Sequence, residues 1–392
     1  MENRTFKIIF AGIIIISSAM YLLNTDFQRI GWFNDDANYI NNARWIAGIQ
    51  NTYKNTAASS LGYSLILAPV ALLSPVKNDA FRIPSLLFSV GSLFLIYLLF
   101  RRNLSRKFIL LLLFMISLSP LFVAYSGTVL SEPAFTFFSL LVLYLLNRYL
   151  QKNIFSIGML IWISICLALL SFIRNEGFLL AGSIFAFLLF RKQKNNLLYM
   201  LLFFMLFISP VFILNIDRTV DKYLFGWSTP IFTKQYLGMV LKSLIYFIES
   251  MINSVILTGF LKDKIKPVII LVDAVIMYLY IKGFFRDRST QVSAVIKLYI
   301  VLYIIVHIVW QARGQRFIVP ILPFLLLYYL DGLKCAGRKI MIAACALNIL
   351  LFLHQDFIFA VSSPRQINPQ TFSYVRKNTE SDAVFVTNFA PR

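Results

Sequence analysis

The sequence predicts an all-α polytopic membrane protein, and three observations carry that prediction. Of its 392 residues, 59% are hydrophobic and only 14% are charged, with phenylalanine alone occurring 38 times. A soluble domain is normally about half apolar and about a quarter charged. The mean hydropathy is +0.75, and apolar runs long enough to cross a bilayer as helices recur along the whole chain.

We expect a bundle of about eleven transmembrane helices, with the N-terminus inside and the C-terminus outside. The predicted spans are 6–23, 81–100, 108–125, 133–149, 154–172, 177–190, 197–214, 267–285, 294–310, 316–330 and 338–354. This count places the basic segments on the inner side, as the positive-inside rule requires. Those segments are the N-terminus with Arg4 and Lys7, 101–107, 148–152, 191–194, 282–288 and 334–339.

The first run, 6–23, could also be a signal peptide. Apolar residues continue through Leu23, past any small-residue cleavage site, which favours an uncleaved anchor.

Two further stretches have an ambiguous relation to the membrane. Segment 61–76 is short and contains Gly62 and Pro69, so we interpret it as a re-entrant or interfacial helix of loop one, beside an amphipathic helix that Asp35 and Asp36 head. Segment 243–260 is long enough to span, and lysines follow it. Its Glu249 and the sidedness of the loops downstream favour a surface-lying helix on the outer side.

Two regions differ in composition. Residues 1–355 form the predicted transmembrane domain, whereas 356–392 form a predicted extracytoplasmic tail. The tail sequence NPQTFSYVRKNTESDAVFVTNFAPR reads as an amphipathic helix, a turn and a strand, AVFVTN. Such a pattern is typical of the start of a small α/β domain, so we expect a tail that is vestigial or a domain that is truncated.

Several function classes are excluded by composition. The net charge of +20 resides mainly in short blocks between apolar runs, which is typical of cytoplasmic loops and argues against nucleic-acid binding. The three cysteines show no CxxC spacing, and two histidines far apart do not suggest a histidine metal site. No Walker loop and no dinucleotide-binding motif is present.

Charged residues gather in the short loops predicted to lie outside. They are Asp35 and Asp36 in loop one, Glu132 in 125–133, Arg174 and Glu176 in 172–177, and Arg313 and Arg316 in 310–323. Charges at a membrane boundary suggest a functional site, and four loops on one side suggest a single outward-facing cavity. Tyr39, one turn after Asp35, would line it.

Structural roles also fit these residues. Acids in a first helical turn offset the helix dipole, Arg174 and Glu176 could pair at a surface for little energy, and Arg313 and Arg316 could anchor at lipid phosphates. Tyr39 could be interfacial packing. Asp273, several residues into a span, could line the cavity or stay near the interface.

Carboxylates beside arginines at a membrane surface suit sugar transfer from a lipid-linked phosphosugar. A carboxylate accepts the proton of an acceptor hydroxyl that attacks the anomeric carbon. The leaving polyprenyl phosphate gains negative charge, and arginine matches phosphate oxygens and stabilises that charge. A single displacement of this kind inverts the anomeric centre. In this scheme Arg174 also binds donor phosphate, while Tyr39, Glu132 and Glu176 line the cavity or contact the acceptor.

The chain resembles the GT-C superfamily of integral-membrane glycosyltransferases, and within it the family-39-like group. That group includes protein O-mannosyltransferases and the aminoarabinose transferases of lipid A. The segments that carry the resemblance are DDANYINNARWIAG, SLGYSLILAPVALL, YSGTVLSEPAFTFFSLLVLYLL, RNEGFLL and RGQRFIVPILPFLLL. The resemblance implies that Asp35 or Asp36 is the catalytic carboxylate, and that Arg313 or Arg316 holds the lipid phosphate.

This sequence departs from that group's pattern in two respects. Its second acid is aspartate where the mannosyltransferases have glutamate, and a clear extracytoplasmic domain is missing or cut short. Both departures leave the acceptor open: glycan, lipid or protein. We expect no cofactor, although Asp35, Asp36 and Glu132 could hold a divalent cation through oxygen ligands.

Two rival functions stay open. A transporter or flippase for a lipid-linked sugar would use the same arginines, but it would place polar residues deep within several spans, and most spans here are apolar at mid-depth. A non-catalytic membrane assembly subunit would tolerate replacement of the acids. We expect the protein in a bacterial plasma membrane, with its site facing outward.

Overall fold

The computed structural model describes most of the chain, and its regular elements are all helical there. The described residues are 3–23, 35–49, 61–75, 77–152, 155–213, 234–255, 266–286, 290–309 and 314–361. Arg313, segment 256–265 and the tail beyond 361 lie outside them, so the predicted tail strand is not described. The last helix runs to Val361 and therefore passes the domain boundary predicted at 355.

The N-terminal half supplies one long helix, two short helices of loop one, and a group of apolar helices. Their bounds are α1 Asn3–Leu23, α2 Asp35–Ile46, α3 Leu61–Leu73, η2 Asn78–Phe81, α4 Arg82–Phe100, α5 Arg106–Leu118, α6 Pro120–Ser126, α7 Ser131–Lys152, α8 Ile157–Ile173, α9 Gly177–Phe190 and α10 Lys194–Ile213. Helices α4, α7, α8 and α10 pack in that order.

The C-terminal half continues the bundle. Its elements are α12 Lys234–Asn253, α13 Lys266–Arg286, α14 Ser293–Val309, η4 Gln315–Ile318, α15 Leu322–Ala336 and α16 Arg338–Val361. Helix α14 packs on both α9 and α12, which joins the two halves. Helices α13 and α15 approach each other closely at two glycines. A Cβ on Gly283 would collide with the carbonyl oxygen of Tyr328, and one on Gly332 with that of Leu279.

One predicted span is broken. The apolar stretch 108–125 forms α5 and α6, which meet at an angle of 60°. Pro120 occupies the first turn of α6, where its missing N–H costs nothing. Because proline disfavours helical backbone in the preceding residue, Ser119 is extended and α5 ends there.

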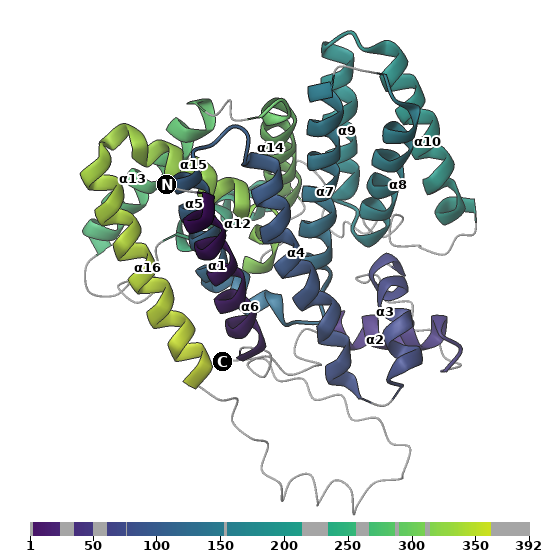
Figure 1. The fold of residues 1–392 in the computed structure, drawn as a ribbon, viewed down its shortest axis with the longest axis horizontal. Coiled ribbons are helices and arrows are strands. Elements are labelled where there is room, and N and C mark those ends of the chain that lie inside the picture. Colours follow the sequence, from purple (N-terminus) through teal and green to yellow (C-terminus); the bar gives the residue numbers. More distant parts are fainter. Residues whose placement is uncertain are drawn as a thin grey trace, which may run out of the picture.

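The molecule has a basic end and an opposite end that carries the outer loops. Glu132 lies in the first turn of α7 and Lys152 in its last, and Glu176 precedes α9 whereas Arg191 follows it. Figure 1 shows α2 and α3 at the lower end of the bundle and the turn between α9 and α10 at the upper end. The predicted outer loops therefore share one end of the described bundle.

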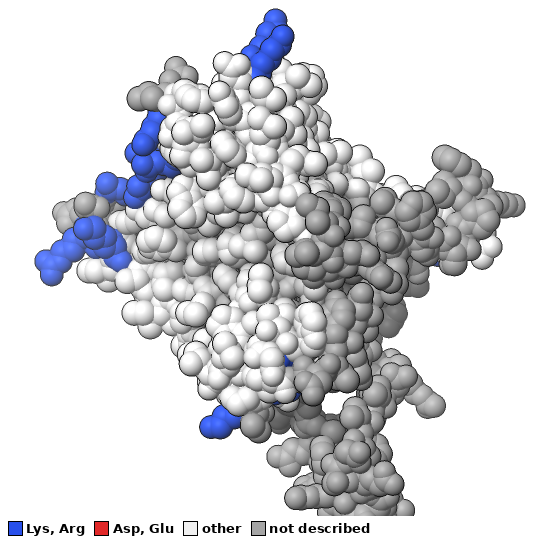
Figure 2. Space-filling model, turned by 90° about the vertical axis from the view of Figure 1, so that its right-hand side faces the viewer, with Lys and Arg blue, Asp and Glu red and all other residues white. Residues whose placement is uncertain are grey.

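The helices are apolar on their outer faces. On the face drawn in Figure 2, the described surface is almost entirely uncharged, and lysine and arginine lie at its margins. By length and hydropathy, four described helices can cross a membrane: Arg4–Leu23, Asn78–Phe100, Ser131–Lys152 and Arg338–Phe357; the bent pair α5–α6 would be a fifth. Shorter apolar helices of 10–17 residues accompany them. The fold is that of a helical membrane protein, while the predicted eleven spans and their orientation stay predictions.

Candidate functional site

Helix α2 brings the first acidic residues to the bundle. Asp35 and Asp36 lie in its first turn and Arg44 in its last, an arrangement that complements the helix dipole. Its buried face rests on α3, and the Tyr39 ring meets the Tyr63 ring edge to face at 5.0 Å. The Tyr39 hydroxyl donates to Ser131 Oγ at 3.2 Å, which ties α2 to the start of α7.

Two tight turns place the other charged side chains. Helix α7 opens with Ser131, Glu132 and Pro133, a residue order that suits a first helical turn. Between α8 and α9, the Gly177 N–H donates to the Arg174 carbonyl oxygen at 2.9 Å. At Gly177 a Cβ would lie 2.5 Å from the Ser171 backbone. Glycine there lets the turn fold back closely, and Arg174 and Glu176 then point together.

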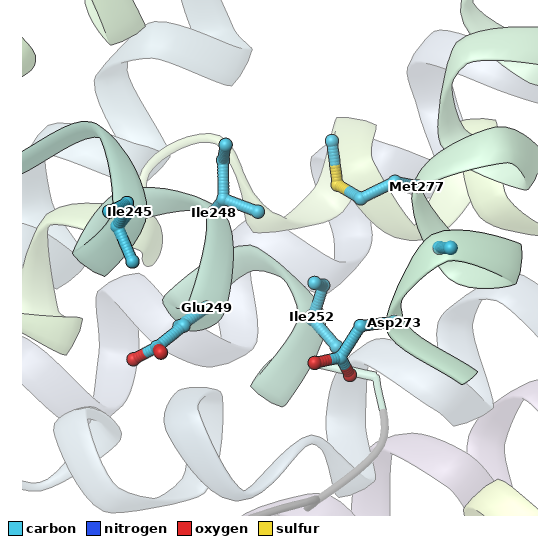
Figure 3. A pocket seen from close by; sticks show the side chains of 7 residues that line it. Ile245, Ile248, Glu249, Ile252, Asp273 and Met277 are labelled. Atoms are coloured by element: carbon cyan, nitrogen blue, oxygen red, sulfur yellow. The ribbon is translucent and has the colours of Figure 1, made fainter. Parts of the chain in front are cut away.

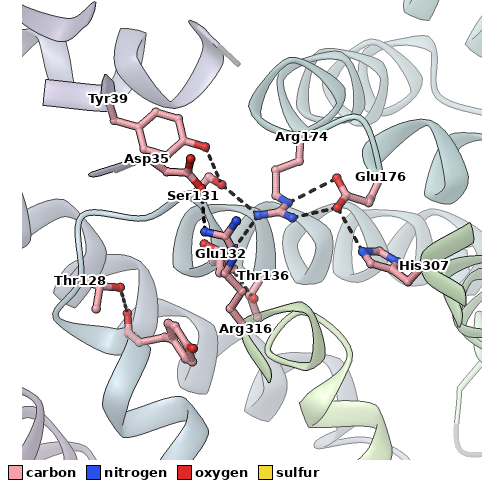
Figure 4. Close-up of polar contacts among 11 residues, drawn as sticks. Asp35, Tyr39, Thr128, Ser131, Glu132, Thr136, Arg174, Glu176, His307 and Arg316 are labelled. Carbon is pink, nitrogen blue, oxygen red and sulfur yellow. Dashed lines mark hydrogen bonds and ion pairs between the residues drawn. The ribbon is translucent and has the colours of Figure 1, made fainter. Parts of the chain in front are cut away.

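Five charged residues, here called the polar cluster, meet at this end of the bundle (Figure 4). They are Asp35, Glu132, Arg174, Glu176 and Arg316. Arg316 Nη1 donates to Asp35 Oδ2 at 2.7 Å, and its Nε lies 3.7 Å from Glu132 Oε1. Arg174 Nη1 donates to the same Glu132 oxygen at 2.7 Å. The two arginines thus share one carboxylate.

Arg174 also donates two hydrogen bonds to the Glu176 carboxylate. Its Nη2 donates to Oε1 at 2.8 Å and its Nε to Oε2 at 3.3 Å, a bidentate arrangement. Its Nη1 additionally donates to Ser131 Oγ at 3.1 Å. The guanidinium lies 5.6 Å from the Phe317 ring centre. Every nitrogen of this side chain is therefore directed by the protein.

Exposure varies systematically through the polar cluster. The side chains of Glu132, Glu176 and Arg174 are 1%, 10% and 11% exposed, whereas those of Asp35 and Arg316 are 13% and 24% exposed. The inner members are nearly removed from solvent, and Arg316 is the member that a molecule arriving from outside meets most readily. A ligand with an anionic group would reach Arg316 first.

The charges in the polar cluster stabilise one another. Burial would raise the pKa of Glu176, but Arg174 and His307 outweigh this and hold it well below the usual range of a glutamate. Burial would lower the pKa of Arg174, yet Glu176 and Glu132 hold it well above the usual value. Burial raises the pKa of Tyr39, so this phenol is neutral at physiological pH.

The structure separates the predicted site residues into three groups. Asp35, Tyr39, Glu132, Arg174, Glu176 and Arg316 come together as described above. Asp36 is 4% exposed, and its Oδ1 accepts from the Ala37 N–H at 2.7 Å. Arg313 lies outside the described residues. Asp273 lies elsewhere, with Glu249, in the wall of a pocket between α12 and α13.

That pocket has a volume of about 270 Å³ and is lined by Ile245, Ile248, Glu249, Ile252, Asp273, Ala274 and Met277 (Figure 3). None of the polar cluster lines it. The carboxylates of Glu249 and Asp273 lie in a mostly apolar wall. Helices α12 and α13, which carry them, are not the elements that carry the polar cluster.

Sequence reasoning missed His307, because an isolated histidine in an apolar run gives no motif. It is fully buried near the end of α14, with Nε2 3.3 Å from Glu176 Oε1. Ser131 and Phe317 were also missed; their only signal is adjacency to Glu132 and Arg316 in the sequence.

No group of three or more His, Cys, Asp or Glu side chains suited to a metal ion occurs among the described residues. Within the polar cluster, Asp35 and Glu132 already face guanidinium groups, which compete with a cation for the same oxygens. The predicted lack of a metal requirement stays a prediction.

Comparisons with known proteins agree with the fold. A family model described as dolichyl-phosphate-mannose-protein mannosyltransferase matches residues 59–214. No curated protein matches the chain significantly. The structure of ArnT from Cupriavidus metallidurans bound to undecaprenyl phosphate is similar with a TM-score of 0.60 and 11% identity, covering 86% of this chain and 61% of ArnT.

The structure of the oligosaccharyltransferase AglB from Archaeoglobus fulgidus, in complex with an inhibitory peptide and a dolichol-phosphate, is similar with a TM-score of 0.54 and 12% identity. That match covers 95% of this chain and 58% of AglB. The chain therefore spans about three fifths of the length of either protein. The chain shares its fold with these two proteins, and the family match over residues 59–214 agrees with the predicted resemblance to the GT-C superfamily.

Proposed function

We propose that the protein is a membrane glycosyltransferase that moves a sugar from a polyprenyl-phosphate donor to an acceptor on the extracytoplasmic face. The observation that carries the proposal is the contact between Asp35 and Arg316 at the more exposed edge of the polar cluster. A proton acceptor and an anion-binding group lie side by side there. The family match, and a fold shared with ArnT, whose structure holds undecaprenyl phosphate, support the proposal.

The donor phosphate competes with Asp35 for Arg316. A guanidinium fork fits phosphate and carboxylate alike, so the arriving phosphate takes over Arg316 and releases Asp35. The freed carboxylate then faces the acceptor hydroxyl. Asp36 is the weaker candidate for the base, because it is buried and accepts a backbone N–H of its own helix.

The chemical step is a single displacement. The acceptor oxygen forms a bond to the anomeric carbon while its proton passes to Asp35. The bond from that carbon to the phosphate oxygen breaks, and polyprenyl phosphate leaves with the electron pair. Arg316, supported by Arg174, stabilises the charge that develops on the phosphate. Attack opposite the leaving group inverts the anomeric centre.

The test measures release of polyprenyl phosphate from a panel of radiolabelled polyprenyl-phosphate sugars by the detergent-solubilised protein. We expect Asp35→Asn to lower the rate by about 100-fold or more, and Arg316→Ala by a similar factor. Asp79→Asn is the matched control, because the Asp79 side chain is 87% exposed and lies outside the polar cluster.

Other outcomes point to the rival functions. Binding of the lipid without turnover, in wild type and variants alike, would favour a transporter. Full activity of Asp35→Asn together with loss in Asp36→Asn would move the base to Asp36. Turnover that persists in EDTA would agree with the expectation of no divalent cation.

A further inference from the structure

His307 makes polar contacts with both nitrogens of its ring. Nδ1 lies 2.8 Å from the carbonyl oxygen of Tyr303, and Nε2 lies 3.3 Å from Glu176 Oε1. Both partners are hydrogen-bond acceptors. The two contacts place the ring between its own helix and the loop that carries Glu176.

The surroundings hold the ring in this orientation. It stacks on Tyr303 with ring centres 4.1 Å apart, and Phe317 and Phe247 lie at 5.0 and 6.0 Å. Among the described elements packed around it, the charged group that faces the ring is Glu176, with Arg174 behind it. Its own helix adds the neutral hydroxyl of Tyr303, whereas η4 and α12 present the phenylalanine rings.

We propose that His307 is a positioning residue for phosphate binding that acts on Arg174 through Glu176. This inference rests on the proposed function. Glu176 Oε1 is shared between His307 and Arg174 Nη2, while Oε2 meets Arg174 Nε. With these two nitrogens held, Arg174 Nη1 is aimed at Ser131 and Glu132.

Charge balance gives the second argument. The polar cluster holds three carboxylates and two guanidinium groups, which leaves it one negative charge in excess. A buried site with net negative charge would repel an arriving phosphate, and interactions are poorly screened where water is excluded. The positions of the two guanidinium groups therefore decide whether the polar cluster accepts an anion, and His307 helps to fix that of Arg174 through Glu176.

A double-mutant cycle tests the inference. Binding of radiolabelled undecaprenyl phosphate is measured for wild type, His307→Gln, Glu176→Gln and the double variant, together with Tm for each. We expect His307→Gln to raise Kd about tenfold in the wild-type background and by less than about threefold in the Glu176→Gln background, since the two residues act as a unit.

Two further variants separate the contact of His307 with Glu176 from the packing of its ring. His307→Phe keeps an aromatic ring between Tyr303 and Phe317 but loses the ring nitrogens, so we expect it to bind the lipid as weakly as His307→Gln. If His307→Gln fails to fold, His307→Phe replaces it in the comparison. His354→Gln is the matched control, because His354 is exposed on α16, and its Kd should equal that of wild type.

The inference is overturned if His307→Gln raises Kd equally in both backgrounds, or if His307→Phe binds like wild type, since either result assigns the residue to packing. Such results leave the proposed function intact when wild type binds the lipid and Asp35→Asn abolishes its release. Failure of wild type to bind undecaprenyl phosphate would overturn the proposed function and this inference together.

Discussion

At the scale of single residues, the polar cluster is built around Arg174, whose guanidinium has several partners. Arg174 donates to Glu132, Glu176 and Ser131 while its guanidinium lies near Phe135 and Phe317. Buried ion pairs of this kind add little net stability, but removing one partner costs about 3–5 kcal/mol. Their value here is orientation, because a fixed guanidinium reorganises little when a phosphate arrives.

The depressed pKa of Glu176 makes stability depend on pH. A carboxyl whose pKa is lower in the folded than in the unfolded chain contributes stability above its unfolded value, about 4.3. That contribution is lost as pH falls toward the folded value. Glu176→Gln should therefore lower the Tm of the detergent-solubilised protein at pH 6, by an amount equivalent to about 2 kcal/mol. This is less than the cost of losing a whole partner, because the glutamine amide oxygen can still accept from Arg174. The difference from wild type should shrink below about pH 4.

The measurement is a series of thermal unfolding curves between pH 3 and pH 6. Asp79→Asn serves as the control, because its exposed side chain should change Tm little at any pH. A difference between wild type and Glu176→Gln that stays constant or widens at low pH would contradict the lowered pKa.

At the scale of elements, several helix boundaries could be predicted and the breaks within them could not. The range predicted as 133–149 is α7, and 177–190 matches α9 residue for residue. Such helices can be predicted because each is a long apolar run that ends at a basic turn. The stretch 108–125 is uniformly apolar, so its division into α5 and α6 depended on Pro120 alone. Of the predicted stretch 243–260, residues 243–253 belong to α12, which begins earlier, at Lys234, and residues 256–260 lie outside the described part of the chain.

Close approach of α13 and α15 depends on glycine. Within a membrane, helix association relies on small residues that let backbones touch. Gly283→Ala would place its Cβ against the Tyr328 carbonyl oxygen, and overpacking of this kind costs about 1–3 kcal/mol. We therefore expect a lower Tm and a lower yield of folded protein.

Gly182→Ala is the matched control for Gly283→Ala. Nothing lies within 4 Å of a Cβ built at Gly182 in α9, and alanine is the better helix former by about 1 kcal/mol. Its Tm should stay equal or rise. A Gly283→Ala variant as stable as Gly182→Ala would show that α13 and α15 do not pack through their glycines.

At the scale of the whole molecule, the sequence could indicate which loops meet but not how they interlock. The predicted side of the membrane was enough to group five residues: Asp35, Glu132, Arg174, Glu176 and Arg316. It could not choose between Asp35 and Asp36, because that choice depends on the rotation of α2 about its axis. It also missed His307, whose partner Glu176 lies 131 positions earlier in the chain.

The orientation of the bundle decides which compartment the polar cluster faces. The basic turns lie at the end of the helices opposite the cluster, so by the positive-inside rule we predict that the cluster faces outward. Asp79 belongs to the cluster's end, because Arg44 of α2 donates to the neighbouring Asn78 Oδ1 at 2.7 Å. Lys192, in the turn after α9, belongs to the basic end.

Cysteine labelling tests this orientation in intact cells. In a variant with Cys166, Cys335 and Cys345 replaced by alanine, Asp79→Cys should react with a membrane-impermeant maleimide. Lys192→Cys should react only after the membrane is permeabilised, because the predicted orientation places this turn in the cytoplasm. The reverse pattern would place the polar cluster inside, where a transferase would have to meet a donor on the inner leaflet, and the proposed extracytoplasmic reaction would be wrong even if the sugar transfer itself were right.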